Sequence, residues 1–209
     1  WRELEAPHKG TSPQIDAGLT GTPGNSGFDT NSTRNVERTA EMAVKVAING
    51  FGRIGRNVLR AIVESGRTDI QVVAINDLGP VETNAHLLRF DSVHGRFPAK
   101  VTVAGDTIDV GYGPIKVTAI KNPAELPHGE MGIDIAMECT GIFTARDKAA
   151  AHLTAGAKRV LVSAPADGAD LTVVFGVNHD KLTKDHLVVS NASCTTNCLA
   201  PVAKVLHDL

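Results

Sequence analysis

Aromatic residues make up only 4% of the 209-residue sequence, and there are only three cysteines. Three cysteines in a chain of this length do not form a disulfide framework, so we expect reduced thiols and a cytoplasmic location. No apolar run reaches the roughly 18 residues that a membrane span requires, and we find no apolar core of a signal peptide. These absences argue against a membrane partner and against a disulfide-stabilised secreted protein.

An excess of charge of one sign is also lacking. The sequence has 21 basic and 23 acidic residues, which give a formal net charge of -2. No basic run is interleaved with aromatic residues, so we expect no nucleic-acid partner. The hydrophobic content is 42%, mainly Val, Ala, Leu and Ile. This mixture is typical of buried parallel strands with packed helices, and the length suits one sizeable domain or slightly more.

The first 41 residues differ in composition from the rest. Residues 10–39 are rich in Gly, Ser, Thr, Asn and Pro and have neither helical nor strand periodicity, which predicts disorder. The sequence starts at Trp1, and Met42 stands directly before a strand-like run. We therefore interpret residues 1–41 as a non-native extension of cloning or upstream origin. The alternative is a targeting peptide, and the acidic residues spread through this segment argue against it.

A glycine fingerprint marks the start of the folded part. Residues 43–49 form a predicted buried strand, the G-x-G-x-x-G pattern follows over residues 50–55, and residues 56–65 have apolar residues at helical spacing. In this pattern the first glycine permits a tight turn, the second lets a pyrophosphate approach the backbone, and the third lets helix and strand pack closely. Its position between strand and helix predicts a dinucleotide site, with an ordinary strand–helix turn as the alternative.

An acidic residue follows at the expected distance. A second predicted strand, residues 70–77, ends in Asp77, which lies 22 residues beyond Gly55. The fingerprint requires an acid about 20 residues on, where it accepts hydrogen bonds from ribose hydroxyls. Leu78 follows, and no basic residue stands beside Asp77 to hold a 2′-phosphate, which favours NAD. The alternative role for Asp77 is to cap a turn.

Further predicted elements alternate along the chain. We expect a helix over residues 145–155 and short hairpins at a sheet edge over residues 98–120. Four more strands are predicted at residues 134–139, 159–163, 172–175 and 187–190. This alternation predicts an α/β fold with a doubly wound parallel sheet of the Rossmann type over residues 42–190.

The segment Ser190–Cys198 places Cys194 among small polar residues, before a helix-like stretch over residues 199–206. A cysteine in the first turn of a helix lies near unpaired N–H groups and the positive end of the helix dipole, and both favour the nucleophilic thiolate. The alternative is a buried thiol that packs as a small hydrophobe. We expect Cys198 to be a structural thiol and Cys139 to be buried. No metal site is predicted, because no histidine or further cysteine has suitable spacing.

From Met42 to Leu209 the chain resembles the phosphorylating glyceraldehyde-3-phosphate dehydrogenase family. Four segments carry the resemblance: residues 48–57, 76–78, 91–96 and 190–198. The resemblance implies a glycolytic enzyme in which Cys194 attacks the aldehyde of D-glyceraldehyde 3-phosphate to give a thiohemiacetal. Hydride transfer to NAD would leave a thioester, and inorganic phosphate would release 1,3-bisphosphoglycerate. It also implies a homotetramer, and a truncated start of an α+β catalytic domain over residues 191–209.

The resemblance also assigns site residues. Ser193, Cys194 and Thr195 match substrate-binding positions, and the Cys194 N–H is expected to help hold the oxyanion. Arg53 and Ile54 match pyrophosphate contacts, Asp77 the adenosine ribose contact, Lys121 a basic residue near the adenine, and Ser163 a residue near the nicotinamide ribose. The adenine-side wall corresponds to Thr140, Gly141 and Phe143. The remaining expected cofactor residues are Asn49, Gly50, Phe51, Gly52, Gly55 and Asn76.

The family's general base is a histidine well downstream of the nucleophile, beyond Leu209. We therefore expect a polypeptide that ends at Leu209 to be close to inactive, since losing the base costs about 10²–10⁴ in rate. His94 lies in a family motif without a proton-transfer role, and His179 is expected in a surface turn.

Two other functions stay open. Erythrose-4-phosphate dehydrogenase shares the cysteine motif, although Asn76-Asp77 and Ser163-Ala164-Pro165 favour the glyceraldehyde enzyme. A non-catalytic NAD-binding module is the second.

Overall fold

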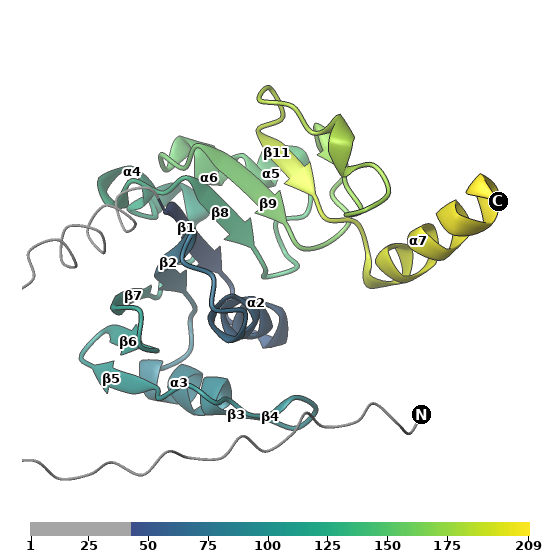
Figure 1. Cartoon of the computed structure of the whole chain (residues 1–209). Coiled ribbons are helices and arrows are strands. Elements are labelled where there is room, and N and C mark those ends of the chain that lie inside the picture. Colours follow the sequence, from purple (N-terminus) through teal and green to yellow (C-terminus); the bar gives the residue numbers. More distant parts are fainter. Residues whose placement is uncertain (1–42) are drawn as a thin grey trace, which may run out of the picture.

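The computed structural model describes residues 43–209, so the expected disorder of residues 1–41 lies outside the described residues (Figure 1). The strands are β1 Val44–Asn49, β2 Ile70–Asn76, β3 Phe90–Asp91, β4 Gly95–Arg96, β5 Thr102–Ala104, β6 Thr107–Asp109, β7 Pro114–Thr118, β8 Ile135–Glu138, β9 Arg159–Val162, β10 Leu171–Thr172 and β11 Val188–Ser190. The helices are α2 Arg53–Glu64, α3 Val81–Arg89, α4 His128–Met131, α5 Arg146–Ala149, α6 Ala151–Thr154 and α7 Cys194–Asp208, with 3-10 turns η1 Pro123–Glu125 and η2 His179–Lys181.

Nine of the strands form one sheet in the order β10-β11-β9-β8-β1-β2-β7-β6-β5. Pairing is parallel from β10 to β7 and antiparallel from β7 to β5. The predicted doubly wound α/β fold is confirmed, and so are the hairpins at the sheet edge. From β1 the chain passes first to β2 on one side and later to β8 on the other. Such a switch in strand order is where open α/β sheets bind ligands, beyond the carboxyl ends of the strands.

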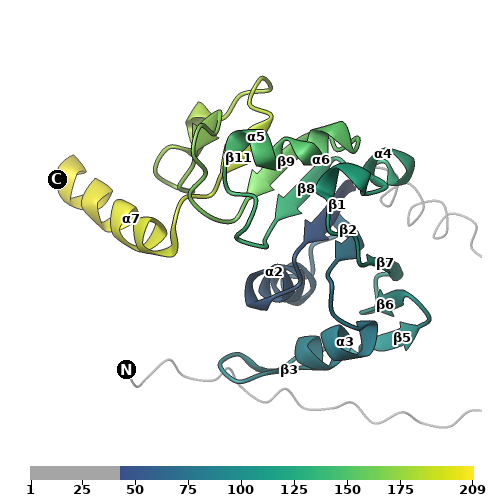
Figure 2. The same cartoon turned by 180° about the vertical axis from the view of Figure 1, so that it is seen from behind.

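Alternating side chains of β1 contribute to the cores on both faces of the sheet. Val46 and Ile48 pack with Leu59 of α2 in the largest core, whereas Ala47 joins a second cluster with Ile133. A third cluster holds α5 against β9 and β11. Figures 1 and 2 show α2 on one side of the sheet and α4, α5 and α6 on the other. Coverage on both faces explains why the central strands are rich in apolar residues that point to both faces.

Two predicted elements have different bounds in the structure. The strand expected at residues 172–175 ends at Thr172, because the Val174 N–H donates to the Asn178 Oδ1 at 2.8 Å and the chain turns. The helix expected over residues 145–155 is split at Ala150, where the Leu153 N–H donates to the Ala150 carbonyl three residues back. Both corrections come from local hydrogen bonds that a hydrophobic pattern does not reveal.

Helix α7 leads away from the sheet and none of its residues is buried (Figure 1). It begins at Cys194, five residues before the predicted helical stretch. Within residues 43–209, no helix is long and apolar enough to cross a membrane.

Candidate cofactor cleft and nucleophile

A cleft of about 520 Å³ lies at the carboxyl ends of β1, β2, β7 and β8. This volume suits a small-molecule or cofactor site. Its lining includes these expected cofactor residues: Asn49, Gly50, Gly52, Asn76, Asp77, Lys121, Thr140 and Phe143. It also includes four residues that sequence reasoning missed: Leu78, Ile120, Cys139 and Ile142. Each of these four is next in sequence to a predicted site residue, and that proximity was the only signal that could have identified them.

The structure gives a different reason for glycine at each of two fingerprint positions and none at the third. Gly50 has φ +88°, and a Cβ there would come within 2.7 Å of the Thr140 nitrogen. A Cβ on Gly55 would overlap the carbonyl oxygen of Gly50. Gly52 has no atom within 4 Å of its Cβ position, so the protein itself does not require a glycine there. Gly52 is also the N-cap of α2 and offers no side-chain hydrogen bond. The first N–H groups of α2 are therefore available to an anion.

Asp77 joins the loops that follow β1 and β2. Its Oδ2 accepts the Phe51 N–H at 2.9 Å, and its Oδ1 accepts the Gly79 N–H at 2.9 Å. The turn-capping role considered from the sequence is therefore present. The carboxylate also lines the cleft, where a ribose hydroxyl could reach it.

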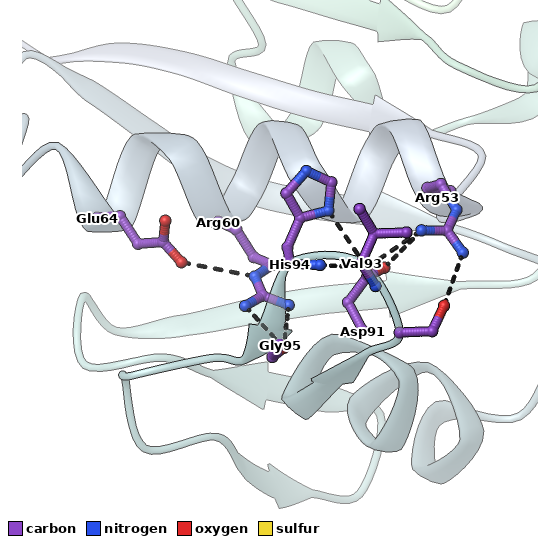
Figure 3. Close-up of polar contacts among 8 residues, drawn as sticks. Arg53, Arg60, Glu64, Asp91, Val93, His94 and Gly95 are labelled. Carbon is purple, nitrogen blue, oxygen red and sulfur yellow. Dashed lines mark hydrogen bonds and ion pairs between the residues drawn. The ribbon is translucent and has the colours of Figure 1, made fainter. Parts of the chain in front are cut away.

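Arg53 does not line the cleft, because it is held by Asp91 (Figure 3). Its Nη1 lies 3.1 Å from both carboxylate oxygens of Asp91, whose side chain is only 5% exposed. The backbone N–H groups of His94 and Val93 donate to the same carboxylate and hold the pKa of Asp91 far below its usual range. The guanidinium therefore stays near the start of α2.

Five other expected cofactor residues lie outside the lining of the cleft: Phe51, Ile54, Gly55, Gly141 and Ser163. The Phe51 side chain is 1% exposed and belongs to the core, whereas Ile54 is about half exposed. Ser163 forms a hydrogen bond with the thiol of Cys139, which itself lines the cleft. Burial, partly offset by this bond, raises the pKa of Cys139 to about 11. Cys139 is partly buried, close to the burial expected from the sequence.

Cys194 is the first residue of α7 and is exposed, so the buried-thiol alternative is wrong for this residue. Ser193 caps the helix, since its Oγ accepts the Thr196 N–H at 3.0 Å. The same Oγ lies 2.9 Å from the Thr195 Oγ1. Ala192 has φ +57°, a left-handed conformation that is costly for alanine and often found at functional sites. Cys198 is exposed as well, so it does not pack as a structural thiol within the described residues.

A second cleft of about 420 Å³ lies beside the start of α7. Its lining residues lie at or after the carboxyl ends of β8, β9, β10 and β11: Thr144, Pro165, Ala166, Asp167, Thr172, Ala192, Ser193 and Thr196. Both clefts therefore open along the same edge of the sheet. His179 is exposed in η2, a surface turn, as predicted. Residues 43–209 contain no group of three or more potential metal ligands.

Comparison with known proteins gives the family. Residues 44–146 match the family described as "Glyceraldehyde 3-phosphate dehydrogenase, NAD binding domain". The chain belongs to the glyceraldehyde-3-phosphate dehydrogenase family. NAD is therefore the cofactor of this domain, as the glycine fingerprint and Asp77 predicted.

Bacterial relatives agree with this assignment. The chain is 87% identical over 167 residues to glyceraldehyde-3-phosphate dehydrogenase of Xanthobacter flavus and 81% identical over 167 residues to that of Cereibacter sphaeroides. Each match covers 80% of this chain and 50% of the relative. The enzyme of Pseudomonas aeruginosa is 60% identical over 167 residues, which cover 79% of this chain and 50% of that protein. The chain spans about half the length of the curated relatives it matches.

Proposed function

We propose that the protein carrying this sequence converts D-glyceraldehyde 3-phosphate, NAD and inorganic phosphate into 1,3-bisphosphoglycerate and NADH. The observation that carries this proposal is the position of Cys194: exposed, at the start of α7, on the sheet edge that also holds the cofactor cleft. A thiol nucleophile beside a hydride acceptor suits the oxidation of an aldehyde.

In the proposed reaction the Cys194 sulfur bonds to the aldehyde carbon and forms a thiohemiacetal. NAD, when bound, supplies the hydride acceptor. Loss of hydride from the former aldehyde carbon and of a proton from its oxygen leaves a thioester on Cys194. A phosphate oxygen then attacks the thioester carbon, and the thiolate of Cys194 leaves. The Cys194 N–H, unpaired at the helix start, would hold the developing oxyanion. Ser193 and Thr195 would contact the phosphate groups.

We propose that NAD lies along the same edge of the sheet. The pyrophosphate would lie over Gly52 at the N-terminus of α2, near Arg53 and Ile54. The ribose hydroxyls would donate to Asp77. The adenine would contact Lys121, Thr140, Gly141 and Phe143. The nicotinamide ribose would lie near Ser163.

The proposal includes a cytoplasmic homotetramer that acts on small molecules without a nucleic-acid or membrane partner. The homotetramer and the location rest on the family relationship, and the balanced charge supports the proposed lack of a nucleic-acid partner.

NADH formation by the native protein tests the proposal. The rate should require the aldehyde, NAD and inorganic phosphate together. Cys194→Ser should abolish it, whereas Cys198→Ser, which changes an exposed thiol on the same helix, should retain it. A full rate in Cys194→Ser would disprove the role of the nucleophile. Faster turnover of erythrose 4-phosphate would favour the sister enzyme, and NAD binding without thiol chemistry would favour a binding module.

A further inference from the structure

A chain of buried polar side chains runs from the cofactor cleft into the interior. Its members are Asn76, Asn49, Glu138, His152 and His128. They come from β2, β1, β8, α6 and α4, and all are buried, Glu138 being only 1% exposed. A buried carboxylate persists only where hydrogen bonds replace its lost hydration. The directions of these bonds can be worked out from the cleft inward.

The backbone of Ile120 sets the orientation of the first two side chains. The Ile120 N–H donates to the Asn76 Oδ1 at 2.8 Å, and the Ile120 carbonyl accepts from the Asn76 Nδ2 at 2.8 Å. Because a backbone amide cannot exchange its donor and acceptor, the Asn76 amide has one allowed orientation. Asn76 Nδ2 also donates to the Asn49 Oδ1 at 2.7 Å. Asn49 must therefore direct its Nδ2 donor toward Glu138.

Both oxygens of Glu138 face donors. Oε2 accepts from the Asn49 Nδ2 at 2.6 Å, and Oε1 accepts from the Thr140 N–H at 2.8 Å and from the Thr140 hydroxyl. A carboxylate satisfies all of these donors, whereas a glutamine would direct its own N–H groups at one of them. Burial opposes ionisation, but hydrogen bonds from His152, Thr140 and Asn49 outweigh it, and the pKa of Glu138 is lowered.

The ionised Glu138 in turn determines both histidine tautomers. His152 Nε2 lies 2.9 Å from the Glu138 Oε2 and must donate to it. His152 Nδ1 must then accept from the His128 Nε2, 3.0 Å away. His128 Nδ1 has no hydrogen-bond partner among residues 43–209. Because Nε2 holds the donated proton, a neutral ring leaves Nδ1 without one. Burial, together with the nearby His152, lowers the pKa of His128 to about 4, in agreement with a neutral ring.

We propose that Glu138 is a positioning residue for NAD, which holds the loops after β1 and β8 in the conformation that binds the cofactor. Glu138 bonds Asn49, which precedes the glycine turn, and Thr140, which lines the opposite wall. The Thr140 nitrogen lies 2.7 Å from the Cβ position of Gly50, so the two loops are in close contact. Movement of Thr140 would therefore alter the turn over which the cofactor lies. This inference rests on the proposed placement of NAD in this cleft.

NAD affinity of the full chain tests the inference, measured by calorimetric titration of the wild type, Glu138→Gln, Asn49→Asp and the double variant. We expect Glu138→Gln to weaken NAD binding at least about tenfold, since a buried charge-assisted hydrogen bond is replaced by opposed donors. In the double variant the introduced glutamine can donate to both His152 and the introduced aspartate, which still accepts from Asn76. We expect the double variant to recover most of the affinity lost by either single variant.

Two further readouts separate positioning from general stability. Ile108→Val leaves a small cavity in the core on β6, and β6 is separated from β8 by β1, β2 and β7 in the sheet. It should therefore lower the melting temperature without changing NAD affinity. Nitrogen NMR of the histidines should show protonated Nε2 on both rings in the wild type and protonated Nδ1 on both in the double variant.

The outcomes distinguish the two proposals. A wild-type chain that does not bind NAD would overturn both the placement of NAD and this inference. A wild type that binds NAD and a folded Glu138→Gln of equal affinity would overturn this inference alone. A double variant no better than Glu138→Gln, or unchanged histidine tautomers, would also contradict it.

Discussion

The cofactor cleft and the turn around Cys194 use similar small polar residues in opposite ways. In the cleft the bonds join distant segments, such as Asn49 and Glu138, which are 89 residues apart, and the groups are buried. Around Cys194 the bonds of Ser193 and Asn197 reach at most six residues along the chain. The cleft is a product of the tertiary fold, whereas the turn is a local motif that leaves its thiol accessible. A polar residue in the sequence therefore does not reveal its role by itself. The role also depends on how far along the chain its hydrogen-bond partners lie.

The cleft holds the thiol of Cys139 and the turn holds the thiol of Cys194. We expect the largest difference between the two regions in the reactivity of these thiols. The raised pKa of Cys139, about 11, leaves far less thiolate at neutral pH than in a free cysteine. We expect iodoacetamide to alkylate Cys139 at least about a hundredfold more slowly than the exposed Cys194. Timed labelling with peptide mass spectrometry measures this, and the denatured chain, where the three thiols become alike, is the control. Equal rates in the folded chain would remove the contrast between the regions.

Variants of two fingerprint glycines should distinguish a role in packing from a role in ligand contact. Gly55→Ala forces a Cβ onto the Gly50 carbonyl and should lower the free energy of unfolding by about 3 kcal/mol. Gly52→Ala meets nothing within 4 Å and should cost about 1 kcal/mol or less, yet weaken NAD binding by filling the space above the helix start. Urea unfolding and NAD titration of both variants check this. A larger loss of stability in Gly52→Ala would contradict it.

A substitution in the turn around Cys194 should change stability only in that turn. Ser193→Ala removes the acceptor for the Thr196 N–H and should cost about 1 kcal/mol in the first turn of α7. Hydrogen exchange of the Thr196 amide should become faster, whereas Ser193→Thr keeps a hydroxyl acceptor and serves as the matched control. Unchanged exchange in Ser193→Ala would show that the cap does not hold the nucleophile's turn.

We expect the smallest change in stability from Asp91→Asn, because the partner Arg53 is half exposed and solvent screens the ion pair. The N–H groups of His94 and Val93 depress the pKa of Asp91 in the folded state. Its contribution to stability is therefore complete above the unfolded pKa of about 3.9 and is lost as the pH falls below that value. The stability difference between wild type and Asp91→Asn should stay constant above a pH of about 5 and narrow as the pH falls below about 4, toward the lower folded pKa of Asp91. A constant difference in urea unfolding would contradict this assignment.

Much of the cofactor cleft could be predicted because its signals are local. Strands β1, β2, β8 and β9 lie within one or two residues of their predicted bounds, and the fingerprint and Asp77 lie at their ends. The helix start at Cys194 was indicated by neighbouring residues too. Prediction failed where a side chain decides the backbone conformation, as at Asn178, whose Oδ1 accepts the Val174 N–H just after β10 ends. The sequence also did not reveal that Arg53 pairs with Asp91.

The sequence by itself determined the order of strands and helices, the glycine turn and the position of Cys194 at a helix start, because each depends on residues close together in the chain. Only the tertiary structure decided which polar groups meet. Glu138 is one acid in an apolar strand, and its sequence neighbours do not reveal that Asn49 and His152 donate to it. Burial makes these bonds obligatory, since a carboxylate without water needs donors, and the fold brings those donors from other strands and helices.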